Sequence, residues 1–202
     1  TLNSETPGTG VITLRDVKAI DANSALVCGV RVNVVGDVDY ILEYDDVIAK
    51  TTDGGTTWTY PYLHNNHIYD DPVVVGDLRP YSISSAGPGV FYASCYQNVL
   101  KSSDSGDHWT VIRTEAAPDS QPYEVEAVDA STLWLLTKSQ LFRPFPGPST
   151  NYPTITLSKT PDSGSTWTTR LEIGDEGQLS PYSIATVGSQ VVWVMVGKLI
   201  YK

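Results

Sequence analysis

Short apolar runs alternate along the chain with clusters of Gly, Pro, Asn, Asp and Ser. Examples are "SALVCGV", "VFYASC", "TLWLLT" and "VVWVMVG". Apolar runs of this length, bounded by turn residues, are typical of β-strands. The chain contains no long stretch of apolar residues at helical spacing and no segment long enough to cross a membrane. The pattern therefore predicts an all-β chain of many short strands.

A two-strand unit recurs four times along the sequence. Each copy has an apolar strand, a turn centred on Asp or Gly, and a second, more apolar strand. The four copies span 17–28, 83–94, 125–136 and 184–195. A unit repeated at this interval is typical of an array of small sheets, because each sheet can cover the edge or face of its neighbour.

A second motif, Ser/Thr-x-Asp-x-Gly-x-x-Trp, follows three of these units. It reads "TTDGGTTW" at 51–58, "SSDSGDHW" at 102–109 and "TPDSGSTW" at 160–167. We call these segments the box turns. Their shared residues are Asp53, Gly55 and Trp58; Asp104, Gly106 and Trp109; and Asp162, Gly164 and Trp167.

The residue types of the box turns have a structural explanation. A tight hairpin turn leaves backbone N–H groups without a ladder partner, and we expect the short carboxylate to accept several of them. The glycine supplies a backbone conformation that a side chain would hinder, and the tryptophan buries a large ring against the turn. We therefore predict that the three aspartates are structural, and the sequence assigns no catalytic residue.

The box turns closely resemble the Asp-box, or BNR repeat. This repeat occurs in sialidases, xyloglucan-degrading hydrolases, sortilin-type receptors and photosystem II assembly factors. The resemblance implies an all-β fold, a β-propeller-like array of about four antiparallel four-stranded blades with three box turns. It places each box turn between the third and fourth strands of a blade, and it does not choose among these families.

The repeat units divide a single domain, 1–202, into approximately 11–60, 79–114, 122–171 and 181–202. The fourth unit stops short, since Lys202 falls where the next box turn would begin. Propellers commonly have four to eight blades, so the array is expected to be incomplete or completed by another chain. A third explanation for the short fourth unit is that the N-terminal "GVITL" (10–14) supplies the outer strand of the last blade. We favour the first two, an incomplete array or one completed by another chain.

The formal net charge of −10 disfavours nucleic acid as a partner, because an acidic surface repels phosphate backbones. The only methionine is Met195, so the numbering includes no initiator methionine. This favours a processed chain at an extracellular, periplasmic or particle surface. We expect no membrane insertion.

Long connections are expected at the end of the blades opposite the box turns, and binding residues concentrate on loops that a rigid scaffold carries. These connections are 31–46, 60–78, 142–152 and 172–180. The connections 60–78 and 142–152 together carry aromatic, amide, imidazole and charged side chains that can bind a sugar or a protein. The candidate binding residues are Tyr62, His64, Asn66, His67, Tyr69, Asp70, Arg143 and Phe145. The alternative is that these segments only pack on neighbouring blades.

Metal binding has weak support in the sequence. His64, His67 and Asp70 lack the spacing of a zinc motif, and we assign no metal ligand. The five acids of "GDVDYILEYDD" (36–46) can hold calcium, although the spacing of an EF-hand loop is absent, so calcium remains the one cofactor alternative. For Cys28 and Cys95 we favour buried thiols over a disulfide, because two cysteines make no disulfide framework.

Two functions remain open. The first is a non-catalytic β-propeller, a binding or scaffolding module that presents its loop-rich face to a protein or glycan. The alternative is a glycoside hydrolase of sialidase-like or xyloglucanase-like type, with its site partly outside this chain. "LFRPFPG" (141–147) offers Phe142-Arg143-Pro144 where sialidases carry Phe-Arg-Ile-Pro, but the isoleucine is absent and the match precedes the third box turn.

Overall fold

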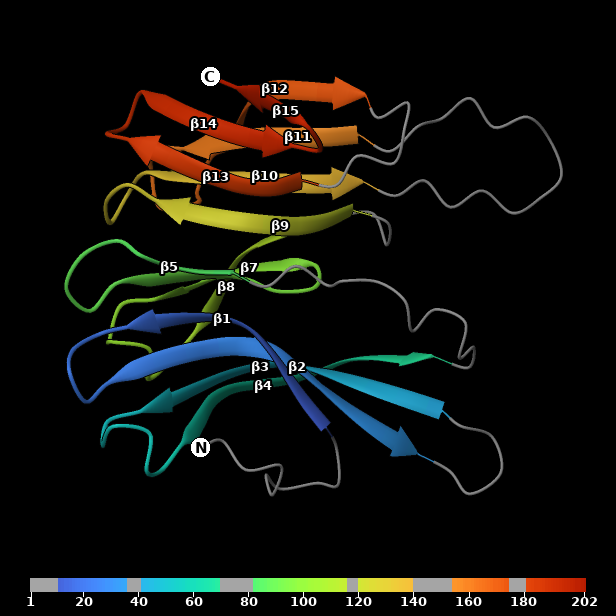
Figure 1. The fold of residues 1–202 in the computed structure, drawn as a ribbon, viewed down its shortest axis with the longest axis vertical. Coiled ribbons are helices and arrows are strands. Elements are labelled where there is room, and N and C mark those ends of the chain that lie inside the picture. Colours follow the sequence, from blue (N-terminus) through green and yellow to red (C-terminus); the bar gives the residue numbers. More distant parts are fainter. Residues whose placement is uncertain (1–10, 36–40, 70–81, 116–119, 140–153, 175–180) are drawn as a thin grey trace, which may run out of the picture.

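The computed structural model describes residues 11–35, 41–69, 82–115, 120–139, 154–174 and 181–202. The regular secondary structure of these residues consists of fifteen β-strands (Figure 1). None of these residues forms part of a helix long and apolar enough to cross a membrane. The strands form four antiparallel sheets, each in chain order.

The first sheet holds β1 (Val11–Ala19), β2 (Ala25–Val35), β3 (Ile41–Thr51) and β4 (Thr59–Tyr69). The second holds β5 (Ser82–Ser85), β6 (Phe91–Ser94), β7 (Asn98–Ser102) and β8 (Thr110–Thr114). The third holds β9 (Ser120–Ala127), β10 (Leu133–Ser139), β11 (Thr154–Thr160) and β12 (Thr168–Gly174). The fourth holds β13 (Pro181–Val187), β14 (Val191–Val196) and β15 (Leu199–Tyr201).

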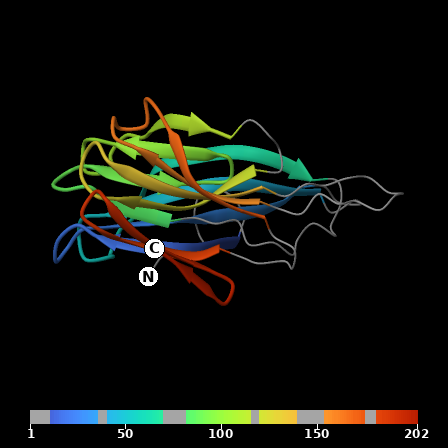
Figure 2. The ribbon, with the colours of Figure 1, turned by 90° about the horizontal axis from the view of Figure 1, so that it is seen from above.

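The first and second sheets follow one another along the long axis of the molecule, and the third and fourth sheets pack together at its other end (Figure 1). The first strands of adjacent sheets lie together, β1 against β5, β5 against β9 and β9 against β13. Viewed along this axis, the fourth sheet (red) lies to one side of the third (Figure 2). The predicted fold, an all-β, β-propeller-like array of about four antiparallel blades, is confirmed.

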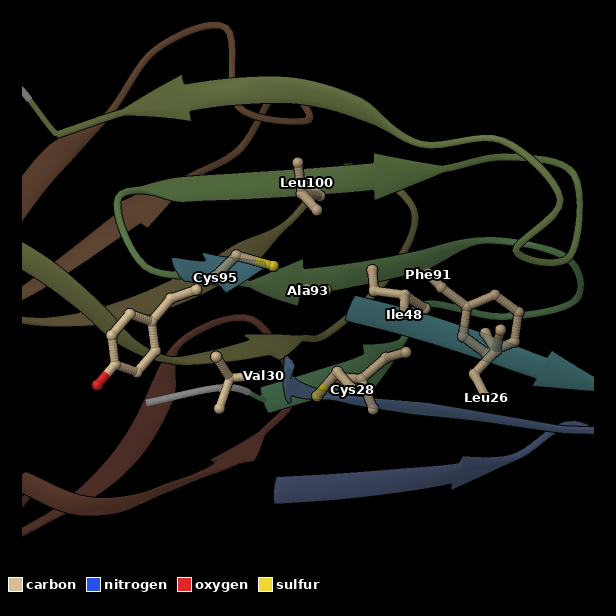
Figure 3. Packing of buried hydrophobic residues seen from close by; sticks show 10 residues of the cluster. Leu26, Cys28, Val30, Ile48, Phe91, Ala93, Cys95 and Leu100 are labelled. Carbon is tan, nitrogen blue, oxygen red and sulfur yellow. The ribbon is translucent and has the colours of Figure 1, made fainter. Parts of the chain in front are cut away.

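Apolar side chains fill the space between neighbouring sheets. Leu26 and Ile48 of the first sheet meet Phe91 and Leu100 of the second, all of them almost fully buried (Figure 3). Burying one such side chain stabilises the fold by about 1.5–3 kcal/mol. Similar clusters join the second sheet to the third and the third to the fourth. The core therefore has a layer for each pair of adjacent sheets, and a further small cluster within the first sheet, formed by Val27, Val47 and Ala49 with Trp58 and Tyr60.

The outward face of the fourth sheet is the exception. Trp193 and Met195 of β14 are 43% and 41% exposed. In the two-strand repeat they align with Trp134 and Leu136 of β10, which are 4% and 0% exposed because the fourth sheet covers them. The fourth sheet thus ends the array with a face of the kind that the other sheets bury.

The two buried cysteines lie in the layer between the first and second sheets. Cys28 comes from β2 and Cys95 follows β6, and both thiols are free (Figure 3). Burial raises the pKa of both thiols, with a smaller contribution from Asp46.

The structure excludes the alternative that was not favoured for the missing strand of the last blade. The segment 11–14 does not complete the last blade, because it begins β1, where Val11–Leu14 pair with Val32–Gly29. This pairing needs only a short loop, which makes it entropically cheaper than pairing with a sheet at the far end of the chain.

The segments 31–46 and 60–78 were expected to be loops, but most of their described residues lie in strands. β2 and β3 stay paired from Ala25 opposite Thr51 to Val35 opposite Ile41, and β4 continues to Tyr69. The backbone hydrogen bonds of this long ladder satisfy polar groups that a loop would leave to water. The first sheet therefore extends well beyond the second, whose strands are four or five residues long.

Candidate functional site

The three box turns share one hydrogen-bond pattern. In the first, the Thr57 N–H donates to Asp53 Oδ1 at 2.8 Å and the Thr57 hydroxyl donates to Asp53 Oδ2 at 2.6 Å. The Thr51 hydroxyl donates to Asp53 Oδ1 and accepts the Gly55 N–H, both at 2.9 Å. The equivalent bonds recur in the other two turns, around Asp104 and Asp162.

Each aspartate accepts one ladder-free backbone N–H rather than the several that the sequence predicted. The side chain two residues before it takes the glycine N–H instead, which explains why the motif begins with Ser or Thr. The bonds to Thr57 lower the pKa of Asp53 to about 2. Similar bonds lower the pKa of Asp104, through His108, and that of Asp162, through Thr166.

The glycine and tryptophan of each box turn also stabilise the turn. The glycines have φ of 87°, 87° and 95° at Gly55, Gly106 and Gly164, which few other residues adopt. The indole N–H of each tryptophan donates to the carbonyl of that glycine, at 3.2, 3.1 and 3.0 Å. Every conserved position of the motif therefore stabilises the turn.

A second repeated device links the innermost strands. Asp16 Oδ2 on β1 accepts the Ile83 N–H of β5 at 2.9 Å. Ser82 Oγ on β5 accepts the Val125 N–H of β9 at 2.8 Å. Glu124 Oε2 on β9 accepts the Ile184 N–H of β13 at 2.9 Å. Ser84 Oγ on β5 accepts a second N–H of β9, that of Ala127, at 3.0 Å. Acceptor side chains on β1, β5 and β9 thus fix the next sheet.

These links were not predicted from the sequence, although the repeat contains their signal. The residues that immediately precede the aligned positions Val17, Ile83, Val125 and Ile184 all carry a side-chain oxygen. They are Asp16, Ser82, Glu124 and Ser183. A polar residue held at one position of an otherwise apolar repeat indicates a specific partner.

Glu124 on β9 is a carboxyl group whose pKa is raised. Burial raises its pKa to about 7, opposed by the bonds from Ile184 N–H and the Ser183 hydroxyl and aided by the nearby charges of Glu126 and Asp16. A carboxyl group with this pKa can hold a proton at neutral pH and release it, as a general acid must.

The long end of the first sheet is fixed by an ion pair. Arg31 on β2 faces Asp45 on β3, with Nη2 2.5 Å and Nε 2.7 Å from Asp45 Oδ2. Asn33 Nδ2 donates to the same oxygen at 3.1 Å. Both charged side chains are almost fully buried, so the pair holds the two strands in one arrangement. Asp45 and Asp46 lie in this strand, so the acids of 36–46 do not form a single loop.

β4 forms the outer edge of this long end and carries five of the predicted binding residues. Tyr62 packs into the layer between the first two sheets with Trp109, and its ring stacks on His64 at 6.1 Å. His64 is exposed, and so is its neighbour Leu63, at 44%. For the other three only the backbone, within β4, is described: Asn66, His67 and Tyr69. The remaining candidates, Asp70, Arg143 and Phe145, lie outside the described residues.

A cleft of about 330 Å³ lies between the third and fourth sheets. Its walls carry Trp134, Arg170 and Lys159 from the third sheet and Gln190, Tyr201 and Lys202 from the fourth, with apolar side chains between them. Trp134 Nε1 is buried and has no hydrogen-bond partner among the described residues. The volume lies at the lower end of the range of about 300–1,000 Å³ that is usual for ligand pockets.

Metal ligands do not gather in the described part of the chain, where no three His, Cys, Asp or Glu side chains are placed to hold an ion. Calcium binding by 36–46 remains a prediction, because most of that segment lies outside the residues whose side chains are described.

Comparisons with known proteins found similarity in structure but not in sequence. The chain matches no protein-family model and no curated protein. It is similar to an α-L-arabinofuranosidase from Fusarium graminearum in complex with an iminosugar inhibitor, with 14% identity and a TM-score of 0.47 over 92% of this chain and 61% of that one. The chain thus spans less than two thirds of the arabinofuranosidase.

Two further solved structures are similar to the chain. YCF48 bound to a D1 peptide shares 14% identity over 96% of this chain and 93% of that one, with a TM-score of 0.25. YCF48 from Cyanidioschyzon merolae shares 12% identity over 96% and 95%, with a TM-score of 0.25. At these levels of similarity no residue role passes from those proteins to this chain.

Proposed function

We propose that the chain is a non-catalytic β-propeller module, built on Asp-box repeats, that binds a protein or glycan at the end opposite its box turns. The observation that carries the proposal is the long end of the first sheet. β2, β3 and β4 each have eleven residues, whereas the strands of the second sheet have four or five. A ribbon of paired strands that projects beyond its neighbour offers a surface that needs no rearrangement to bind.

The side chains of this ribbon support the proposal. The buried Arg31–Asp45 pair fixes β2 against β3, and the outer strand β4 presents Leu63 and His64 to solvent. Successive side chains of a strand point to opposite faces, so Leu63 and His64 offer an apolar contact on one face of the ribbon and an imidazole on the other, and each can contact a peptide or a sugar ring. We further propose that the module acts at an extracellular, periplasmic or particle surface, where an acidic propeller meets such partners.

The test is a binding screen of the purified chain on glycan and peptide arrays, followed by variants of the ribbon. Leu63→Ser with His64→Ala should weaken binding of any selected ligand at least tenfold (about 1.4 kcal/mol) without lowering Tm. Val111→Ser on β8 is the matched control, because Val111 is a similarly exposed apolar residue on an outer strand, at 51%. Binding that survives in the double variant, or that is lost in the control, would refute the assignment of the ribbon.

A second candidate function is glycoside hydrolysis, and Glu124 is the observation that favours it. Its pKa of about 7 suits a general acid, and Glu126 and Asp16 supply further carboxylates near it. Retaining and inverting glycosidases both use such acids in pairs. Hydrolysis of aryl glycosides by the chain, abolished in Glu124→Gln, would establish an enzyme. The link from Glu124 to the Ile184 N–H gives this residue a structural task that needs no catalysis.

A further inference from the structure

The layer between the second and third sheets shows how a box tryptophan is held. Trp167 packs on a cluster that includes Tyr92 and Val99 of the second sheet and Leu133 and Leu135 of the third. The Arg113 guanidinium lies 4.9 Å from the centre of its ring. A Cβ added at Gly164 would lie 2.7 Å from Ile112 Cδ1, so the box turn and its neighbour fit closely.

The strand register assigns an equivalent residue to each position of this socket in the next layer. Tyr92 lies opposite Lys101, as Trp134 lies opposite Lys159. Val99 lies opposite Arg113, and in the third sheet Leu157 lies opposite Leu171 in the same way. A bulge follows each of these pairs, at Ile112 in the second sheet and at Arg170 in the third. By the two-strand repeat, Leu133 and Leu135 correspond to Val192 and Val194. These equivalents are Trp134, Leu157, Lys159, Arg170, Leu171, Val192 and Val194, and all seven line the 330 Å³ cleft.

The cleft therefore lies at the position in its layer that corresponds to the socket of Trp167, with Leu171 in place of Arg113 and Arg170 in place of Ile112. The fourth sheet, which would supply the tryptophan, has β15 as its last strand, and no described strand pairs with the outer edge of β15. Lys202 lies over the Trp193 ring at 5.2 Å, as Lys159 lies over Trp134 at 5.2 Å. In the third sheet the residue after that lysine, Thr160, begins a box turn.

We propose that the cleft and the edge of β15 bind an extended segment of the form Ser/Thr-x-Asp-x-Gly-x-x-Trp followed by a strand. The indole fills the cleft, and the strand pairs with β15 and gives the fourth sheet its fourth strand. A carbonyl oxygen of the segment can accept the N–H of Trp134, which has no other acceptor among the described residues. Main-chain pairing supplies affinity in such strand addition, and the pocket for the side chain supplies specificity.

Charge favours the same occupant. Arg170 and Lys202 lie exposed at the cleft and Lys159 lies within it, in a chain whose net charge is −10. Three cations gathered at one cleft attract a segment that carries an aspartate before its tryptophan.

The probe is a fluorescein-labelled peptide with the sequence of 160–174, "TPDSGSTWTTRLEIG", titrated against the whole chain and followed by anisotropy. We expect saturable binding that weakens at least tenfold when the peptide tryptophan is replaced by alanine. The Arg170→Glu variant of the protein should also bind more weakly, since it reverses an exposed charge at the cleft. Arg15→Glu is its matched control, because Arg15 is an exposed arginine on β1 of the first sheet, and it should bind as the native chain does.

Hydrogen exchange locates the bound peptide independently of the variants. The amides of Leu199–Tyr201 should gain protection when the peptide binds, because an added strand pairs with that edge. The proposal is overturned if the alanine peptide binds equally well, if protection appears elsewhere, or if no binding occurs up to the solubility limit of the peptide. None of these outcomes bears on the ribbon of the first sheet, which lies at the other end of the array.

Discussion

Alanine should be far more damaging at Gly106 than at Gly55, although the two glycines hold the same place in their box turns. Both have a φ of 87°. Their surroundings differ, because a Cβ at Gly106 would lie 2.6 and 2.9 Å from the two Cδ atoms of Leu26 in the preceding sheet. At Gly55 the described atoms within 4 Å are two of the Trp58 ring, at 3.8 and 3.9 Å.

The expected loss of stability has two contributions, one from the backbone conformation and one from packing. An alanine at this φ costs about 1–2 kcal/mol in either turn, because its Cβ crowds the following carbonyl. At Gly106 the new methyl group must also displace Leu26, which is completely buried in the layer and has no room to move. Overpacking of this kind costs a further 1–3 kcal/mol or so. Each kcal/mol lowers Tm by about 2–4 °C in a chain of this size, so Gly106→Ala should melt roughly 2–12 °C below Gly55→Ala.

The assay is thermal and urea denaturation of the native chain, Gly55→Ala and Gly106→Ala, followed by circular dichroism. A double-mutant cycle with Leu26→Ala isolates the contact, because the space left by Leu26 should accommodate the methyl group. Equal losses of stability at the two glycines, or additive losses for Gly106→Ala and Leu26→Ala, would refute the claim that the second box turn packs on the first sheet.

Three further predictions concern charge and burial. Folding lowers the pKa of Asp53 from 3.8 to about 2, so its stabilising effect is present above about pH 4 and is lost as the pH falls towards 2; Asp53→Asn should flatten the dependence of Tm on pH over that range. Folding raises the pKa of Glu124 from 4.5 to about 7, so the effect of Glu124 on stability has the opposite dependence on pH. The stabilisation is present below pH 4.5 and is lost as the pH rises through 7. Glu124→Gln should therefore raise Tm more at pH 8 than at pH 4.5. Cys28 and Cys95 are buried thiols of raised pKa, so iodoacetamide at pH 8 should modify them in urea and not in the native chain, as mass spectrometry would show; rapid labelling of the native chain would contradict their placement.

The repeats made much of the fold predictable from sequence. Asp53, Asp104 and Asp162 precede a glycine and a tryptophan at fixed distances, and each such turn joins the third strand of a sheet to the fourth. Local turn chemistry of this kind acts over a few residues, so a single sequence contains all the information it needs.

The extent of the first sheet could not be predicted in the same way. The stretch 60–69 contains a proline, two histidines and two asparagines, which lower β-propensity, yet it pairs along β3 from Ile48 to Leu42. Pairing with an existing strand outweighs propensity, and that effect depends on contacts between distant residues. The links from Asp16, Ser82 and Glu124 to the next sheet were missed for the same reason, because each joins residues more than forty positions apart.

The layered core also bears on the cooperativity of unfolding. Among the described strands, the main contacts between sheets join neighbours in the series, so the stability of the described part of the chain is close to a sum of sheet terms and nearest-neighbour terms. The fourth sheet has one such neighbour and leaves Trp193 and Met195 exposed, whereas the second and third sheets are covered on both faces. Local unfolding should therefore begin at β13–β15 and proceed towards the middle of the array. The free energy of opening measured by amide exchange in β13–β15 should be a fraction of the free energy of global unfolding. A sheet supplied to that end would raise the barrier to this fraying and make the series unfold as one unit.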